Sequence, residues 1–266
     1  MIIIGEKLNG FVKNTAAAIQ NRDEAFLRAL ALDQANAGAD YIDVCAANGE
    51  TEAATLQWLA ALAEEASGVP VCLDSPNPEV IAAVLPHCKR EGVVNSVSLE
   101  SGKIDTLFPL LAHTNWKVVA LLCSNAGVPE TVSGRLELFE QILDAAKRYE
   151  IDESRLLIDP VLHALATDEA AFVTYAECAH EIRKRSDRVH IVSGMSNISF
   201  GLPARAQINR AFLVLAMQAG MDSAILNPLD RELMGLLYAT RALLGEDEYC
   251  MEYIGAYREG KFGGNA

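Results

Sequence analysis

Positive charge is scarce in this sequence. Lys and Arg number 22 against 36 Asp and Glu, which gives a formal net charge of −14. Nucleic-acid-binding proteins present a basic surface and anionic membranes attract basic segments, so this balance argues against both kinds of partner. No apolar run approaches the length that spans a bilayer. The first residues lack a basic region and a cleavage site, so we expect no signal peptide and a cytoplasmic location.

Several cofactor and metal motifs are also missing. The six cysteines form no Cys-x-x-Cys pair, and most lie in apolar runs, where a free thiol behaves as a small hydrophobe. We therefore expect neither a disulfide framework nor a metal site. There is no Gly-x-x-x-x-Gly-Lys loop and no dinucleotide fingerprint. Lys7 alone follows a predicted strand as a Schiff-base lysine would, and a surface or salt-bridged role is its alternative.

Short apolar runs alternate with longer helical patterns along the whole chain. The runs predict strands at Met1–Ile4, Asp40–Cys45, Val69–Leu73, Gly92–Val94, Lys117–Leu122, Arg155–Ile158, Val189–Val192 and Asp222–Leu226. The longer patterns predict helices at Asp23–Ala37, Glu52–Ser67, Pro78–His87, Ile104–His113, Ser133–Tyr149, Asp168–Lys184, Pro203–Gln218 and Arg231–Leu243.

Eight strand–helix units within 266 residues predict one α/β domain over residues 1–266. The expected architecture is a (β/α)8 TIM barrel, and a doubly wound open sheet is the alternative. Residues 245–266 are rich in glycine, and we expect them to form a loosely held C-terminal tail.

Polar side chains follow the predicted strands, and in a barrel these ends meet at one mouth. The candidates are Glu6, Asn9, Asp43, Asp74, Asn95, Asn125, Asp159, Asn197 and Asn227. Carboxylates and amides suit a flat, nitrogen-rich heterocycle, because a carboxylate accepts two parallel N–H bonds from an amino-pyrimidinone edge. Taken singly, Asp74 also fits a helix cap and Asp159 a turn. Their conjunction at several strand ends favours a ligand site.

The most distinctive turn follows the seventh predicted strand. The apolar run His190–Val192 stops at Ser193-Gly194, and Ser196, Asn197 and Ser199 come within the next five residues. A glycine among small hydroxyls and an amide permits close approach to a ligand.

Six stretches together carry a resemblance to a known family. They are Ile3–Gly10, Cys72–Asn77, Val94–Ser96, Leu157–Pro160, Gly194–Ser199 and Ile208–Phe212. On these motifs, in this order, the chain resembles the pterin-binding barrels, most closely the methyltetrahydrofolate:corrinoid-protein methyltransferases. The likeness continues through Gly220–Ile225.

The resemblance implies a pterin-binding TIM barrel with the pterin ring in its mouth. Residues matching Asp74, Asn95 and Asp159 hydrogen-bond the pyrimidine side, and the residue matching Asn197 reaches N5. Four further residues of the matching motifs complete the predicted binding set: Gly194, Ser196, Glu6 and Asn9. Tetrahydrofolate or methyltetrahydrofolate is then the substrate, a partner protein carries the corrinoid (cobalamin), and the chain forms a homodimer.

The implied activity moves a methyl group between N5 of tetrahydrofolate and the cobalt of the corrinoid protein, in either direction. Asn197 would stabilise a proton at N5, and Asp74 would hold the water chain that exchanges it. An O-demethylase system is one of the methyl sources that the sequence leaves open. The alternatives are another folate-using barrel, such as a dihydropteroate synthase-like enzyme, and a non-catalytic folate-binding module.

The chain departs from the family pattern at specific positions. Lys7 stands where arginine is usual, and Asp43-Val44-Cys45 stands where Asp-x-Asn is frequent. Dihydropteroate synthases need a lysine after the seventh strand, and Met195-Ser196-Asn197 in this chain counts against that branch. Arg205 and Arg210 are expected either to meet the glutamate tail of folate or to form surface salt bridges.

Overall fold

Eight parallel strands close into a barrel in the computed structural model, which describes residues 1–47, 49, 51–100 and 102–263. Neighbours in the sequence pair in order, and β1 pairs with β8 to complete the ring. The strands are β1 Ile2–Asn9, β2 Tyr41–Cys45, β3 Val71–Asp74, β4 Val93–Leu99, β5 Lys117–Ser124, β6 Leu156–Asp159, β7 His190–Gly194 and β8 Ser223–Leu226. This closure confirms the predicted (β/α)8 barrel and excludes the doubly wound sheet.

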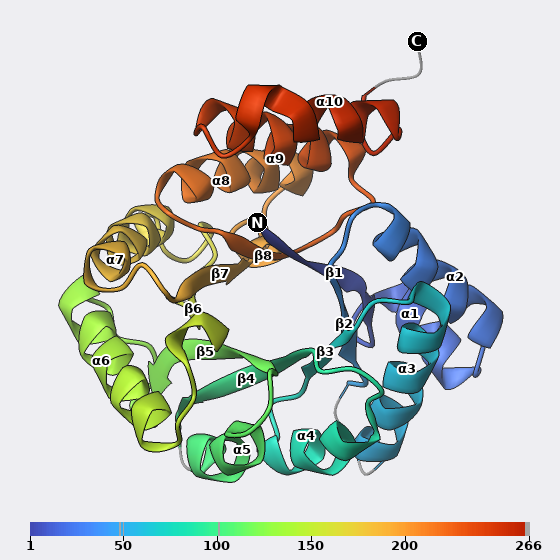
Figure 1. The fold of residues 1–266 in the computed structure, drawn as a ribbon, viewed down its shortest axis with the longest axis horizontal. Helices are drawn as coiled ribbons and strands as arrows, with labels where there is room; N and C mark the ends of the chain where they lie inside the picture. Colours follow the sequence, from blue (N-terminus) through green and yellow to red (C-terminus); the bar gives the residue numbers. More distant parts are fainter. Residues whose placement is uncertain (48, 50, 101, 264–266) are drawn as a thin grey trace.

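Helices surround the barrel (Figure 1). They are α1 Lys13–Gln20, α2 Glu24–Asn36, α3 Glu52–Ser67, α4 Pro78–Val84, α5 Lys103–Leu111, α6 Val132–Arg148, α7 Ala171–Arg185, α8 Arg205–Gln218, α9 Arg231–Leu243 and α10 Met251–Arg258. Short 3-10 turns are η1 Leu85–His87, η2 Glu153–Arg155, η3 Met195–Asn197 and η4 Glu248–Cys250. Across the described residues, none of the helices combines the length and apolarity that crossing a bilayer requires.

Side-chain caps fix where several of these helices begin. Asp23 accepts a hydrogen bond from the Phe26 amide at the start of α2, and Asp230 accepts one from the Leu233 amide at the start of α9. Each cap satisfies a backbone donor that the first turn of a helix leaves unpaired.

The first and fourth strands run much further than the sequence predicted. We expected the first strand to end at Ile4, but β1 continues to Asn9 because its pairing with β2 resumes after a register shift between Gly5 and Leu8. The fourth strand likewise continues past Val94 to Leu99, across register shifts in its pairing with β5. Glu6, Asn9 and Asn95 therefore lie within strands rather than after them.

An apolar plug fills the barrel beneath its mouth. Its buried members come from six different strands: Ile4, Cys72, Val93, Val119, Leu157 and Val192. Side chains two residues apart on a strand point to the same face. Glu6, Asp74, Asn95 and Asp159 each follow a plug residue by two positions. The alternation that builds the plug thus also directs these polar groups toward the barrel axis, one layer nearer the mouth.

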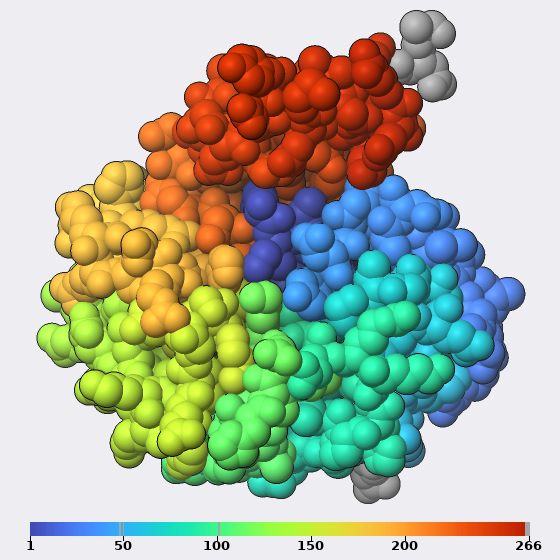
Figure 2. Space-filling model, viewed as in Figure 1, coloured from blue at the N-terminus to red at the C-terminus, as the bar shows by residue number. Residues whose placement is uncertain are grey.

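The C-terminal residues do not form the loosely held tail that we expected. Here α10 lies outside α9 at one side of the barrel and forms a raised lobe there (Figures 1 and 2). Phe262 is only 6% exposed, and its ring stacks on Tyr238 of α9 with the centroids 5.6 Å apart. Tyr253 contacts the same ring at 4.9 Å. Aromatic packing therefore anchors this segment, while residues 264–266 lie outside the described chain.

Candidate functional site

The mouth of the barrel holds a cavity of about 560 Å³ at the carboxyl ends of the strands. Most of its lining is polar and includes three carboxylates and three amides: Glu6, Asp43, Asp74, Asn9, Asn95 and Asn197. Gly194 and Ser196 line it as well. Of the predicted binding set, all of it described, only Asp159 falls outside this lining, and the strand-end candidates Asn125 and Asn227 fall outside it as well. Which of them contact a bound pterin stays a prediction.

Two carboxyls from adjacent strands lie close together in this cavity. Burial, followed by repulsion from Asp74, raises the pKa of Asp43 well above its usual range. Burial also raises the pKa of Asp74 to about 6. Asp43 is 2% exposed, and its Oδ1 has no hydrogen-bond partner among the described residues. At neutral pH the pair therefore offers one ionised carboxylate, Asp74, and one buried carboxyl with an oxygen open to a ligand.

Asp159 is a buried carboxyl at the end of β6, 8% exposed. Its Oδ1 accepts a hydrogen bond from the Val161 amide at 2.8 Å, and burial raises its pKa to about 7. Buried Arg135 of α6 holds the turn below it, because Nη1 donates to the carbonyl oxygens of Pro160 at 2.9 Å and Val161 at 3.2 Å. Asp159 is thus, beside Asp74, a second carboxyl at the strand ends whose charge changes close to neutral pH.

The turn after β7 is held from two sides. Ser196 Oγ donates to the Glu6 carboxylate, whose oxygens lie 2.9 and 3.0 Å away, although 190 residues separate the two in sequence. On the other side, Arg205 Nη2 donates to the Ser196 carbonyl oxygen at 2.6 Å. A Cβ at position 194 would lie 3.3 Å from Asn197 Nδ2, so Gly194 leaves room for that amide. The local structure therefore presents Asn197 to the cavity.

Residues outside the predicted binding set also line the cavity. Asp43, Lys7, Phe11 and Arg205 all line it. Asp43 was one of the strand-end candidates, at the start of Asp43-Val44-Cys45, but it was not part of the predicted binding set. Arg205 and Arg210, for which the sequence left two roles open, lie in different places. Arg205 lines the mouth, whereas Arg210 forms ion pairs with Asp230 and Glu232.

A metal centre has no support in the part of the chain that the structure describes, where no three His, Cys, Asp or Glu side chains are grouped to hold an ion. Besides the cations of Lys7 and Arg205, the polar side chains that line the mouth are carboxylates, amides and one hydroxyl. Such groups bind the N–H edges of a heterocycle and accept or release protons.

Together, the fold and the mouth define a TIM barrel with a polar ligand site at the carboxyl ends of its strands. Residues 13–227 match the model of the family described as pterin binding enzyme, and the chain belongs to that family. It is 47% identical to the protein of Eubacterium limosum named methylcorrinoid:tetrahydrofolate methyltransferase, over 99% of this chain and 98% of that one.

Other relatives share less with this chain. It is 31% identical to the methionine synthase of Mycobacterium tuberculosis over 85% of its length, but the match spans only 20% of that larger protein. Among solved structures, the dihydropteroate synthase of Coxiella burnetii in complex with pteroic acid superposes with a TM-score of 0.66 at 14% identity, covering 91% of this chain and 94% of that one. The Xanthomonas albilineans enzyme gives 0.63 at 18%, with 92% of both chains covered. At these identities the structural likeness establishes the shared fold.

Proposed function

We propose that this chain is a methyltransferase that moves a methyl group from a methylated corrinoid protein to N5 of tetrahydrofolate. The observation that carries the proposal is the 47% identity, over nearly the full length of both chains, to a protein whose name states that transfer. The cavity supports the proposal because carboxylates and amides line the barrel mouth, where we expect a pterin to bind.

The residues of the mouth fit a pterin ring. Asp74, ionised at neutral pH, accepts two parallel N–H bonds from the amino-pyrimidinone edge. The buried and unpartnered Oδ1 of Asp43 offers a further acceptor at the same wall of the cavity. Leaving such an oxygen without a donor costs about 1–3 kcal/mol, so a ligand N–H that reaches it contributes to affinity. These contacts explain why a neutral heterocycle enters an acidic mouth.

The corrinoid of the partner protein supplies the methyl group as a cation equivalent and retains the electron pair of the broken bond. This chain must orient N5 toward that partner and remove the proton that N5 loses. The Asn197 amide oxygen accepts a hydrogen bond from N5–H and so directs the nitrogen lone pair outward. An open mouth rim, where Phe11 and Phe200 are both exposed, leaves the partner access.

The alternatives are less well supported. A dihydropteroate synthase-like reaction would need the lysine that Met195-Ser196-Asn197 replaces. A folate-binding module that stores the cofactor would need no group at N5, yet Asn197 lines the cavity.

The reaction can be followed by the absorbance of cobalamin. We expect methylcobalamin to lose its methyl group when this protein and tetrahydrofolate are both present, and Asn197→Ala to slow the change. Measured folate binding without any change in the cobalt spectrum, also with a corrinoid protein as donor, would contradict the transfer and favour storage.

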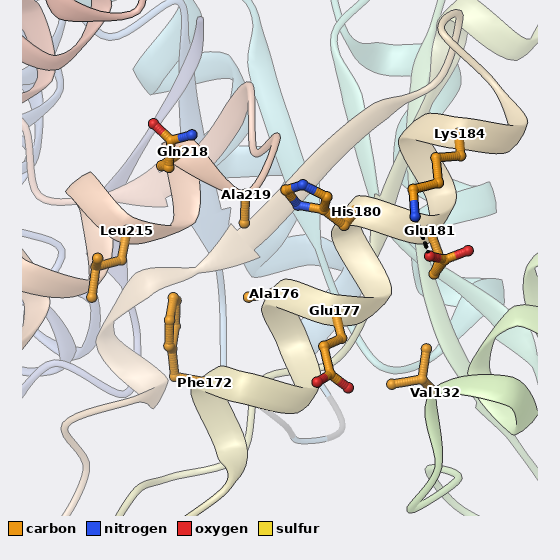
Figure 3. Close-up of a pocket in the computed structure, with 10 residues that line it drawn as sticks. All are labelled: Val132, Phe172, Ala176, Glu177, His180, Glu181, Lys184, Leu215, Gln218 and Ala219. Carbon is orange, nitrogen blue, oxygen red and sulfur yellow. Dashed lines mark hydrogen bonds and ion pairs between the residues drawn. The ribbon is translucent and has the colours of Figure 1, made fainter.

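A homodimer is part of this proposal. A groove of about 560 Å³ on the outer wall is lined by Phe172 and Ala176 of α7 and by Leu215 of α8 (Figure 3). Leu215 is 50% exposed and also lines a neighbouring hollow with Leu236 of α9. A second copy that covers this apolar surface would bury it symmetrically.

Sedimentation of the wild type and of Leu215→Glu tests the homodimer. We expect a dimer for the wild type and a shift toward monomer for the variant, and a monomeric wild type would overturn this part of the proposal.

We further infer that the chain works in the cytoplasm, where an O-demethylase would load the corrinoid protein.

A further inference from the structure

We propose that Ser196 and Glu6 form a proton relay that removes the N5 proton as the methyl group arrives. This inference rests on the proposed methyl transfer and assigns Glu6 the role of base in that reaction. Glu6 was expected to be a cofactor-binding residue, but both of its carboxylate oxygens lie within hydrogen-bond distance of the Ser196 hydroxyl.

The geometry of the relay is continuous within the cavity. Ser196 immediately precedes Asn197, and both residues line the same cavity as Glu6. The Ser196 hydroxyl lies 2.9 and 3.0 Å from the two Glu6 oxygens, which is a normal donor–acceptor distance for an O–H group beside a carboxylate. A hydroxyl in this position accepts a proton from one side while it donates its own to the carboxylate on the other.

The backbone of the relay is fixed independently of the hydroxyl. Arg205 donates from Nη2 to the Ser196 carbonyl oxygen at 2.6 Å and from Nε to Ser199 Oγ at 3.0 Å. The Ser196 side chain is therefore held toward Glu6 on β1. The two ends of the relay come from opposite ends of the chain and meet because β1 and β7 flank β8 in the closed barrel.

The charged groups around Glu6 make it a moderate base. Burial raises the pKa of Glu6, whereas the Ser196 hydrogen bond, Lys7 on β1 and Arg205 on α8 act to lower it. On β2, Asp43 also lies close enough to interact with the Glu6 charge. The balance is a carboxyl with a raised pKa, which holds a transferred proton more firmly than an exposed glutamate would.

The N5 lone pair forms the bond to the methyl carbon, and the electron pair of the broken bond stays with the donor. The N5 proton, which the Asn197 amide oxygen holds in a hydrogen bond before transfer, passes across at most one water to Ser196 Oγ as the Ser196 proton passes to the Glu6 carboxylate. Glu6 then releases that proton to solvent. No oxidant or reductant beyond the methyl donor is required.

The decisive variant is Glu6→Gln. Glutamine still accepts a hydrogen bond from Ser196 through its Oε1, so the turn keeps its position, but the amide cannot take up a proton. With methylcobalamin and tetrahydrofolate, we expect kcat to fall about 100-fold or more while the Kd for tetrahydrofolate stays within about threefold. A wild-type kcat for Glu6→Gln would overturn the relay and leave the proposed methyl transfer standing, because the wild-type protein reports on that transfer in the same assay.

A second variant and a control complete the test. Ser196→Ala removes the hydroxyl and should lower kcat to a similar extent, with the unfolding midpoint compared against the wild type. Glu100→Gln is the control. Glu100 follows β4, pairs with Lys103 at 2.6 Å and lies outside the cavity lining, so we expect this variant to keep wild-type kcat.

The pH profile supplies an independent readout. In the direction toward tetrahydrofolate, Glu6 must be ionised, so the rate rises with pH through its pKa. Glu6→Gln should remove that limb from kcat measured at saturating tetrahydrofolate, while the acid-side loss of affinity that Asp74 causes stays in both proteins. A limb retained in kcat contradicts the relay.

Discussion

Arg205 Nη2 lies 2.6 Å from the carbonyl oxygen of Ser196 and donates a hydrogen bond to it. The first residue of α8 is thereby joined to the 3-10 turn that carries Asn197. A charged donor on a backbone acceptor contributes about 1.5–3 kcal/mol, so this contact is strong enough to hold the turn in one position.

Arg205→Ala should therefore loosen the turn without removing any predicted pterin-contacting group. We expect kcat for methyl transfer to fall about tenfold, since a small displacement of an orienting group is costly for catalysis. Arg210→Ala is the matched control on the same helix, because Arg210 pairs with Asp230 and Glu232 away from the mouth. Equal effects of the two substitutions on kcat would show that Arg205 has no special part in positioning.

Tetrahydrofolate affinity should depend on pH through Asp74. Its pKa is raised to about 6, so the carboxylate that accepts two N–H bonds is present above that pH and is lost as the pH falls through it. Titration calorimetry between pH 5 and 8 should thus show weaker binding on the acid side.

Asp74→Asn should weaken tetrahydrofolate binding at pH 7 by about 10- to 100-fold. Because Asp159 has a pKa of about 7, Asp159→Asn is needed to separate its contribution to the curve. Binding that is flat across this range in the wild type would count against an ionised Asp74 as the pterin acceptor.

Asn197→Ala should separate catalysis from binding. The amide has its main effect on N5 in the transition state, so we expect kcat to fall about 100-fold and the Kd for tetrahydrofolate to change less than about threefold. Stopped-flow absorbance and equilibrium binding measure the two quantities. Losses of equal size in both would place Asn197 in ground-state binding instead.

The C-terminal segment gives a prediction about stability. Phe262→Ala removes a buried ring that contacts Tyr238 and Tyr253, and we expect the free energy of unfolding to fall by about 2–4 kcal/mol. Tyr249→Ala, at a side chain that is 86% exposed, should change it by less than about 0.5 kcal/mol. Urea denaturation compares the two, and a neutral Phe262→Ala would mean that the segment is held loosely after all.

Most of the barrel was predictable from local patterns. Strands such as Tyr41–Cys45 and Lys117–Ser124 are short apolar runs bounded by polar turns, and a parallel barrel buries them on both faces. Glu6, Asp74 and Asn95, three of the polar residues that line the mouth, were predictable in a similar way, since each falls two positions beyond a buried residue of the plug.

The remaining features depend on contacts between distant residues. The Glu6–Ser196 hydrogen bond spans 190 residues, and no local pattern encodes it. The C-terminal helix was missed because its packing depends on the contact of Phe262 with Tyr238 of α9. In addition, Tyr249 and Cys250 adopt left-handed backbone angles, which separate this helix from the preceding one. Asp43 was a strand-end candidate, but no local pattern shows that burial on the barrel axis leaves its Oδ1 without a hydrogen-bond partner among the described residues.

The most direct test of the central claim follows the methyl group itself. Methylcobalamin labelled with ¹³C in its methyl group is mixed with this protein and tetrahydrofolate, and the label is followed by NMR. We predict that the resonance moves from cobalt to N5 of tetrahydrofolate, only with the protein present and far more slowly with Asn197→Ala. A label that stays on cobalt while tetrahydrofolate is bound, with a corrinoid protein as donor as well, would contradict the account.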